Sequence, residues 1–391
     1  MAVGVLLGPV TGVLRHDWLE IIAPFFAALT LIVILFDGGR HLRAGELGRP
    51  ALPAVGLALL TFGFSCAAVA ILAQAAAAVG WLPRPWTLQH SLLLGTILGG
   101  PSSVVILPSM TVARVPPATA AVVGLESAIT DVLCVVGAGT IMQFLLRGAE
   151  ATAPAAVLGR MFGIGFGLGA ATGAIWIPVL ALLRGKRSAF PLTLSGLLIL
   201  YVVVDRVGGS AALAVLTSAV LVGNASWILR KARIRVEPVA AAEDGDIYSQ
   251  LVFIVKSFFF TFIGAMLGPP RGLAALGLVL GLALLPVRLP GAWLTSRLLR
   301  LPPEESGIVS VAVPRGLAAG VLATLPAAAG IPGTQGLSGV VFPAVVTTIL
   351  VFTVGFRLVR RGRGPRDGGV DAPVAPGAGP PDDADASGLQ P

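Results

Sequence analysis

Long apolar stretches alternate with short polar segments along most of the chain. A helix of about 20 residues crosses roughly 30 Å of hydrocarbon, so the pattern predicts an all-α polytopic protein with about twelve transmembrane helices. They are expected near residues 2–14, 18–37, 51–79, 87–112, 117–146, 155–183, 189–204, 210–229, 248–268, 272–288, 306–327 and 335–359. The first stretch is too short to span a bilayer and does not resemble a secretory signal, so we expect that a first helix is missing.

Composition supports a membrane protein. Hydrophobic residues make up 55% of the 391 positions, charged residues 12%, and the mean hydropathy is +0.91. The net charge of +8 does not indicate a nucleic-acid partner, because the basic residues flank apolar segments and are not interleaved with aromatic residues. We therefore expect the chain to contact membrane lipid.

Basic residues mark one side of the membrane. Alternate loops are rich in Arg and Lys, whereas each loop between them holds one arginine or none. The basic segments are 40–49, 114, 184–187, 230–235, 297–300 and 357–366. Because cytoplasmic loops carry the excess of positive charge, this pattern predicts a multi-pass protein of the plasma (inner) membrane with a cytoplasmic C-terminus. We expect a transmembrane domain over residues 1–361 and a disordered cytoplasmic tail, rich in Pro, Gly, Asp and Ala, over 362–391.

Helix-breaking residues interrupt two of the predicted helices. The first break is Gly99-Gly100-Pro101, followed by Ser102 and Ser103, and the second is Pro314-Arg315-Gly316. Each by itself fits a simple proline kink. Together, beside intramembrane charges, they favour two broken helices that cross at a transport site, because non-helical backbone at membrane depth lines a cavity or is buried in protein.

Two carboxylates, Glu126 and Asp131, lie inside the apolar stretch 117–146. A charge near the bilayer centre costs roughly 2.5–3.5 kcal/mol on insertion scales, so the pair indicates an ion or proton pathway. Five residues separate them by about 140° around a helix, so they do not share a face. They therefore need different partners.

Five short motifs carry a resemblance to a known family. They are Leu35-Phe36-Asp37-Gly38-Gly39, the Glu126-Ser127 to Asp131 run, Gly208-Gly209-Ser210 through Gly223-Asn224, Lys256-Ser257-Phe258-Phe259-Phe260, and Pro314-Arg315-Gly316. Their order resembles that of the monovalent cation:proton antiporters, in particular the sodium/proton exchanger branch. The resemblance implies an inverted-repeat fold with two crossing broken helices, a separate dimerisation domain and a homodimer. It implies antiport of Na⁺, or of another monovalent cation, for H⁺ by alternating access, with no cofactor.

The resemblance also implies roles for residues. Asp131 matches the carboxylate that binds either the cation or a proton. Thr130 occupies the position that is Asn in the electroneutral branch and Asp in the electrogenic branch, so the resemblance also implies that Thr130 belongs to the ion- and proton-binding group. With one titratable carboxylate here, we expect electroneutral exchange. Arg288 is the implied partner of Glu126 in a structural ion pair, with an arginine that reaches the lipid headgroups as the alternative.

One motif departs from the family. Many relatives carry Thr-Asp-Pro in the first broken helix, where this chain has Pro101-Ser102-Ser103. The two serine hydroxyls and freed backbone carbonyls can complete an oxygen shell for a small hard cation.

Three further charged residues have candidate roles, and two of them, Lys256 and Asp37, are open to two interpretations. Lys256 either lines the pathway or pairs with an acid, or its ammonium reaches the membrane surface from a helix end. Arg315 is expected to hold the crossing together by bonding freed carbonyls. For Asp37 we favour a solvated acid at a helix end beside Arg40, with an ion-access funnel as the alternative.

Other function classes fit less well. Gly336-Leu337-Ser338-Gly339 mimics a membrane serine protease motif, but that chemistry needs a histidine on a neighbouring helix, and none of the three histidines lies at a suitable depth in the predicted topology. No metal-ligand spacing beyond a transported cation is present, so we do not expect an enzyme. A cation channel and a K⁺/H⁺ antiporter remain alternatives.

Overall fold

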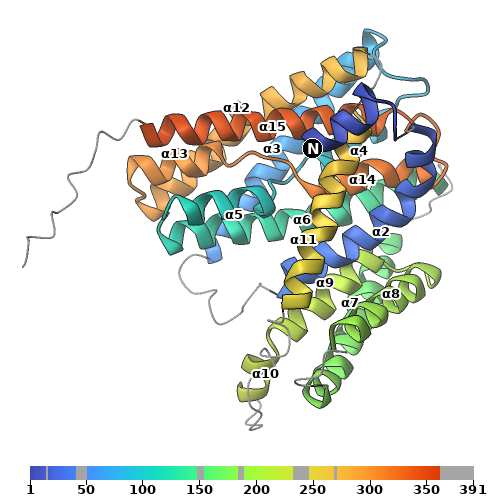
Figure 1. Cartoon of the computed structure of the whole chain (residues 1–391), viewed down its shortest axis with the longest axis vertical. Coiled ribbons are helices and arrows are strands. Elements are labelled where there is room, and N and C mark those ends of the chain that lie inside the picture. The colour runs from blue at the N-terminus through green and yellow to red at the C-terminus, as the bar shows by residue number, and fades with distance from the viewer. Residues whose placement is uncertain are drawn as a thin grey trace, which may run out of the picture.

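The computed structural model describes residues 1–14, 16–40, 51–147, 154–183, 189–231, 246–267 and 271–361. Within these residues it is all-helical, without strands (Figure 1). The predicted tail at 362–391 and much of the basic loops at 41–49, 184–187 and 232–235 lie outside the described residues.

The helices follow the predicted apolar stretches closely. In chain order they are α1 (Ala2–Val5), the π-helical turn η1 (Leu6–Val10), α2 (His16–Arg40), α3 (Ala51–Ala78), α4 (Leu88–Ile97), α5 (Ser103–Val112), α6 (Pro117–Arg147), α7 (Pro154–Leu182), α8 (Ala189–Arg206), α9 (Ala211–Gly223), α10 (Ala225–Lys231), α11 (Asp246–Ala265), α12 (Arg271–Leu299), α13 (Pro303–Val311), α14 (Leu317–Ala328) and α15 (Leu337–Arg361).

Six of the described helices are long and apolar enough to cross a membrane, or seven if the bent pair α9 and α10 counts as one span. This count is below the predicted twelve partly because the interrupted helices are split. Their halves α4, α5, α13 and α14 contain 10, 10, 9 and 12 residues, which is too short for a single crossing.

Two helices differ from the prediction. α12 continues to Leu299, well past the predicted end at 288, although Pro286 and Pro290 lie inside it. Neighbouring helices, here α3 and α15, stabilise a proline-containing membrane helix. The predicted helix 210–229 is instead bent by 61° at Asn224, whose side-chain amide donates to the Val220 carbonyl.

The helices pack in two groups (Figure 1). In one group α12 packs on α15 and α3, and α3 packs on α4 and α6. In the other, α9 packs on α7, α2 and α8. α14 packs on α2, and α11 contacts both of these helices, so the groups meet along α2, α11 and α14.

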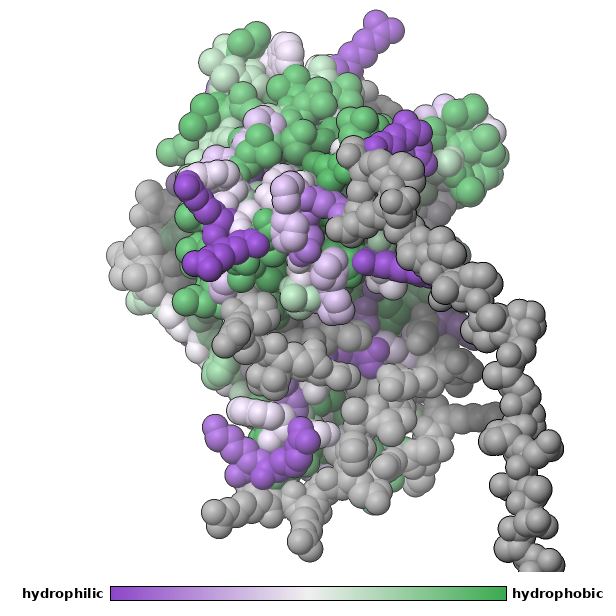
Figure 2. Space-filling view, turned by 90° about the vertical axis from the view of Figure 1, so that its left-hand side faces the viewer, coloured by the Kyte–Doolittle hydropathy of each residue, from purple (hydrophilic) through white to green (hydrophobic). Residues whose placement is uncertain are grey.

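The outer surface is largely apolar. Many large apolar side chains are exposed, among them Phe25, Ile71, Phe166 and Leu182. Figure 2 shows that the upper part of one face is mostly hydrophobic, with polar side chains in small groups. Such a surface fits contact with lipid rather than with water.

Candidate functional site

The two interrupted segments lie side by side. The Ser102 N–H donates to the Pro314 carbonyl at 2.8 Å. Two glycines make the close packing possible, because a Cβ at Gly100 would lie 2.6 Å from the Thr130 hydroxyl and a Cβ at Gly316 would collide with the Ser102 side chain. The breaks at 98–102 and 312–316 therefore form one packed unit, which brings Gly99, Gly100 and Pro101 near Pro314, Arg315 and Gly316.

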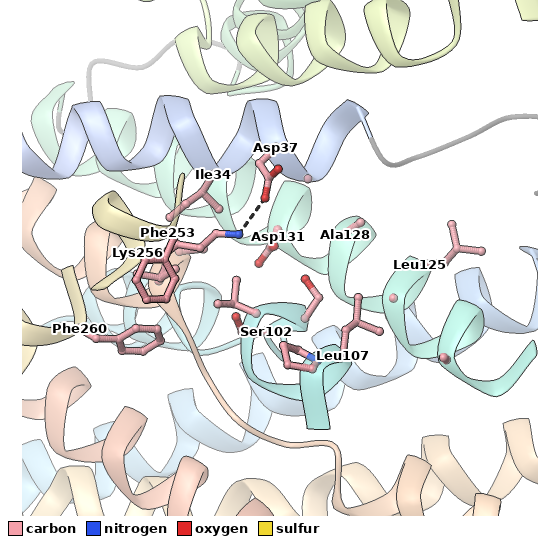
Figure 3. A pocket seen from close by; sticks show the side chains of 18 of the residues that line it. Ile34, Asp37, Ser102, Leu107, Leu125, Ala128, Asp131, Phe253, Lys256 and Phe260 are labelled. Atoms are coloured by element: carbon pink, nitrogen blue, oxygen red, sulfur yellow. Dashed lines mark hydrogen bonds and ion pairs between the residues drawn. The ribbon is translucent and has the colours of Figure 1, made fainter. Parts of the chain in front are cut away.

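A cavity of about 670 Å³ lies next to these breaks. It is bounded by residues of α2, α5, α6, α11 and α14, and most of its lining is apolar. The polar side chains in the lining are those of Asp37, Ser102, Ser103, Asp131, Lys256 and Ser257 (Figure 3). The structure thus brings five of the sequence-predicted site residues into one space.

Asp131 is half-buried and faces this cavity from α6. Its carboxylate has no hydrogen-bond or ion-pair partner within the described part of the chain. Ser102 and Ser103 line the same cavity at the start of α5. A carboxylate beside two hydroxyl groups supplies oxygen ligands of the kind that hard cations prefer.

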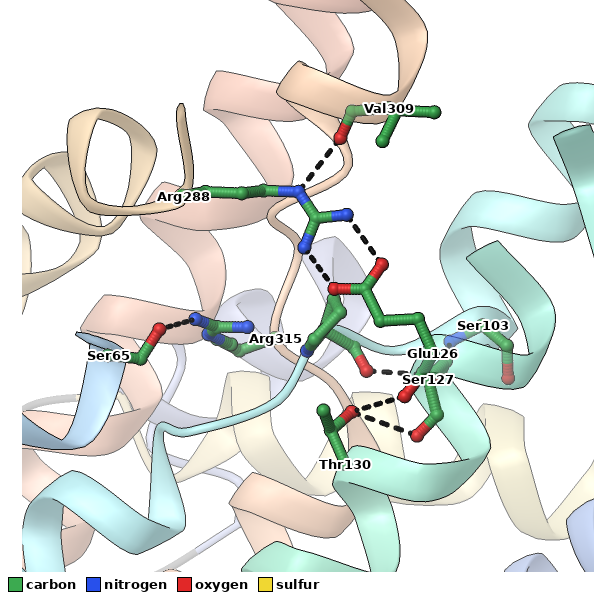
Figure 4. A network of polar contacts seen from close by, with 9 residues as sticks. Ser65, Ser103, Glu126, Ser127, Thr130, Arg288, Val309 and Arg315 are labelled. Carbon is green, nitrogen blue, oxygen red and sulfur yellow. Dashed lines mark hydrogen bonds and ion pairs between the residues drawn. The ribbon is translucent and has the colours of Figure 1, made fainter. Parts of the chain in front are cut away.

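Glu126 is held apart from the cavity in a buried ion pair (Figure 4). Arg288 Nη1 and Nη2 donate to Glu126 Oε1 and Oε2 at 2.5 and 2.6 Å, and Arg288 Nε donates to the Val309 carbonyl at 2.8 Å. The side chains of Arg288 and Glu126 are 1% and 0% exposed. This geometry excludes the alternative in which Arg288 reaches the lipid headgroups.

Thr130 does not reach the cavity. Its hydroxyl is fully buried and lies 3.0 Å from the carbonyls of Glu126 and Ser127, one turn back on the same helix. Its packing against Gly100 makes it part of the contact between α6 and the first break. The structure thus places Thr130 at the packed first break and outside the cavity lining.

Ser127 is a site residue that sequence reasoning missed. Its hydroxyl accepts the Ser103 N–H at 2.7 Å and donates to the Pro101 carbonyl at 3.0 Å (Figure 4). It therefore satisfies one backbone donor and one backbone acceptor that the break leaves free. The available signal was a small polar residue between the two carboxylates of an otherwise apolar helix.

Contrary to the expectation from the sequence, Arg315 does not bond the freed carbonyls. Its Nη2 donates to Ser65 Oγ at 3.0 Å, and its backbone N–H donates to Thr348 Oγ1 at 2.9 Å. Its Nε and Nη1 are buried without a partner in the described residues. The carbonyls of Pro101 and Pro314 accept from Ser127 and Ser102 instead.

Asp37 is not a freely solvated acid, and here the favoured interpretation was wrong. Lys256 Nζ donates to its Oδ2 at 2.8 Å, Tyr248 Oη donates to its Oδ1 at 2.9 Å, and Arg40 Nε lies 3.6 Å from Oδ1. α11 packs against α2 and brings Lys256 and Tyr248 to the acid. Of the two interpretations of Lys256, the structure has the ion pair, with the ammonium at the cavity wall (Figure 3).

Comparison with known proteins gives the family. Residues 1–360 match the family described as sodium/hydrogen exchanger, transmembrane. The chain belongs to this sodium/hydrogen exchanger family. Membership agrees with the resemblance found in the motifs and with a multi-pass membrane protein.

The chain is distantly similar to two K(+)/H(+) antiporters. The chain is similar to the K(+)/H(+) antiporter NhaP2 of Shewanella oneidensis, with 26% identity over 368 residues that cover 90% of this chain and 59% of that protein. It is 25% identical over 363 residues to the K(+)/H(+) antiporter NhaP2 of Shewanella baltica, with the same coverage. The chain thus spans 59% of the length of these relatives.

A solved structure shares the fold. The sodium proton antiporter MjNhaP1 from Methanocaldococcus jannaschii, determined at pH 8, matches with a TM-score of 0.74 and 21% identity. The match covers 92% of this chain and 90% of that one. The chain therefore shares its all-helical fold with MjNhaP1.

Proposed function

We propose that the chain is a secondary antiporter that exchanges a monovalent cation, Na⁺ first, for H⁺. The observation that carries the proposal is the carboxylate of Asp131, which faces the cavity beside both broken helices and has no partner in the described residues. Glu126, the other carboxylate of α6, is neutralised by Arg288. Family membership supports exchange as the activity.

Competition for Asp131 couples the two ions. A proton neutralises the carboxylate, and a cation neutralises it with help from the oxygens of Ser102 and Ser103. An empty, negative carboxylate is poorly solvated when the cavity closes, so the transporter changes its access mainly when one of the two ions is bound. One carboxylate then exchanges one cation for one proton, without net movement of charge.

The cavity extends toward the cytoplasm in this proposal. Its lining includes Leu107 and Pro108 of α5 and Ala120 and Ala121 of α6, close to the α5–α6 connection that holds Arg114. The pattern of basic loops assigns that connection to the cytoplasmic side. The state described here is accordingly open to the inside, and α15 ends on the cytoplasmic side.

The two helix groups support a division of labour. We assign the group with α3 to α6 and α12 to α15 to the transport core, in which the broken pairs α4/α5 and α13/α14 are the inverted-repeat counterparts. The group with α2, α7 to α9 and α11 is assigned to dimerisation in a homodimer. The expected total of about twelve spans is reached when each broken pair counts as one crossing and when α2, α11 and the short segment of α1 and η1 are counted as well.

K⁺ is the second candidate cation, because the relatives from Shewanella are named K(+)/H(+) antiporters. The polar lining supplies oxygen ligands that suit either ion. A cation ranking therefore belongs in the first experiment.

The test is proton movement in proteoliposomes that contain the purified chain and a pH-sensitive dye. Adding Na⁺, Li⁺ or K⁺ to the wild type should collapse a pH gradient, and Asp131→Asn should abolish the response. Asp205→Asn is the matched control, because this carboxylate is exposed at the end of α8, away from the cavity. Exchange that survives in Asp131→Asn would remove Asp131 from the mechanism.

Charge movement separates the remaining alternatives. Electroneutral exchange should run at the same rate with and without an imposed membrane potential. A cation channel instead passes current in the absence of a pH gradient. A potential-dependent rate would contradict the proposed one-to-one exchange.

A further inference from the structure

The cavity that holds Asp131 has a second carboxylate in its wall, and that one is already paired. Asp37 Oδ2 accepts from Lys256 Nζ at 2.8 Å, and both residues line the cavity (Figure 3). Both are only partly exposed, at 17% and 23% of their side chains. Their charges cancel, so Asp131 carries the one uncompensated charge among the described lining residues.

Ligand chemistry alone does not restrict this cavity to monovalent ions. Carboxylate and hydroxyl oxygens are also the preferred ligands of Ca²⁺ and Mg²⁺. What differs is the balance of charge. A monovalent cation neutralises the single free carboxylate, whereas a divalent cation leaves an excess positive charge in a cavity with mostly apolar walls.

We propose that Lys256 determines the valence of the cation that this cavity accepts. By occupying Asp37, its ammonium group prevents Asp37 and Asp131 from acting together as a two-carboxylate site for a divalent cation. The inference rests on the proposed function, because it assigns a selectivity determinant to the same cavity. It makes Lys256 a specificity residue that never has to bind the transported ion.

The neighbouring charged groups support this role for Lys256 in particular. Arg40 Nε lies 3.6 Å from Asp37 Oδ1, but its guanidinium stacks on the Tyr248 ring at 4.0 Å and Arg40 does not line the cavity. Tyr248 contributes a neutral hydroxyl to the same Oδ1 atom. Lys256 is therefore the cationic residue that faces the cavity shared with Asp131. Arg40 and Tyr248 still contact the Asp37 carboxylate when the Lys256 ammonium is removed.

The experiment is calorimetric titration of Ca²⁺ into the purified full-length protein, without any transport step. Wild type should bind Ca²⁺ only weakly. Lys256→Met removes the ammonium group that faces the cavity from Asp37 Oδ2 and should bind Ca²⁺ at least about tenfold more tightly than wild type, since one unit of charge in a poorly solvated cavity changes affinity by this order. Lys256→Arg keeps the charge and should behave as wild type.

Two double variants locate the gained site. Asp37→Asn with Lys256→Met restores a neutral wall and should lose the Ca²⁺ binding, and Asp131→Asn with Lys256→Met should lose it as well. These variants also separate charge from structure. Any disruption of the wall by Lys256→Met is common to the single variant and both double variants, so Ca²⁺ binding that is present only in the single variant depends on the two carboxylates. Each protein is first required to elute as a single species in size-exclusion chromatography.

Asp37→Asn alone tests the proposal in a protein that keeps Lys256. It leaves an unpaired ammonium group on the wall, so the apparent KM for Na⁺ in proteoliposomes should rise, and the added Lys256→Met substitution should return it to the wild-type value. The proposal is overturned if Lys256→Met gains no Ca²⁺ affinity, or if it keeps that affinity without Asp37. Ca²⁺ binding is measured without exchange. A wild type that shows no exchange would therefore contradict the proposed function, but the Ca²⁺ titrations would still test the role of Lys256.

Discussion

The Glu126 carboxylate and the Arg288 guanidinium face each other through two parallel contacts, of 2.5 and 2.6 Å, and neither side chain is more than 1% exposed. Such a pair contributes little beyond what a well-packed apolar pair gives, but removal of one partner leaves a buried charge uncompensated. The pair joins α6 to α12 and, through the Val309 carbonyl, to α13. It therefore fixes the helix that carries Asp131.

Single removal of either charge should lower stability strongly. We expect Glu126→Gln or Arg288→Met to destabilise the protein by about 3–5 kcal/mol, because a lone buried charge remains. The double variant should recover much of this loss. Thermal unfolding in detergent measures the effect, with Arg297→Met as the control, since Arg297 is exposed on the same helix and stacks on Trp293. Singles as stable as wild type would contradict a structural role.

Gly316 should tolerate no side chain. A Cβ there overlaps the Cβ and Oγ of Ser102, so Gly316→Ala must push apart the two broken segments. We expect a lower Tm and loss of exchange. Ser102→Gly in the same chain should restore most of the Tm, because it removes the atoms in the way. Gly139→Ala on α6, where nothing lies within 4 Å of an added Cβ, should leave the Tm unchanged.

Thr130→Val should leave cation affinity intact. The hydroxyl is bound to carbonyls of its own helix and lies outside the cavity lining, so its removal costs about 1 kcal/mol of stability at most. Ser102→Ala, which removes a hydroxyl in the cavity, should raise the apparent KM for the transported cation. Equal KM increases in both variants would show that Thr130 contributes to ion binding.

The apparent KM for the cation should rise as the pH falls. A proton and a cation compete for Asp131, so more protons leave fewer carboxylates free, and strict competition approaches about a tenfold change for each pH unit in the acidic limit. The maximal rate should change far less than the KM when both sides are held at the same pH. Initial rates in proteoliposomes over a cation series at several pH values measure this. A KM that does not depend on pH would exclude a shared site.

The sequence by itself determined the features that depend on neighbouring residues. Apolar length predicted where most helices lie, and Gly99-Gly100-Pro101 and Pro314 predicted both interruptions, because a missing side chain or a missing backbone donor acts within one helical turn. The spacing of Glu126 and Asp131 predicted that they lie on different faces, and helix geometry alone requires this.

Tertiary structure decided which distant groups meet. Asp37 and Lys256 are 219 residues apart, and local sequence cannot show that α2 and α11 bring them within 2.8 Å. The bond from Arg315 to Ser65 and the capping role of Ser127 likewise depend on which distant segments pack together. Hydrophobic pattern and helix breakers are properties of a single segment, whereas the partner of a polar group depends on which groups packing has left unsatisfied.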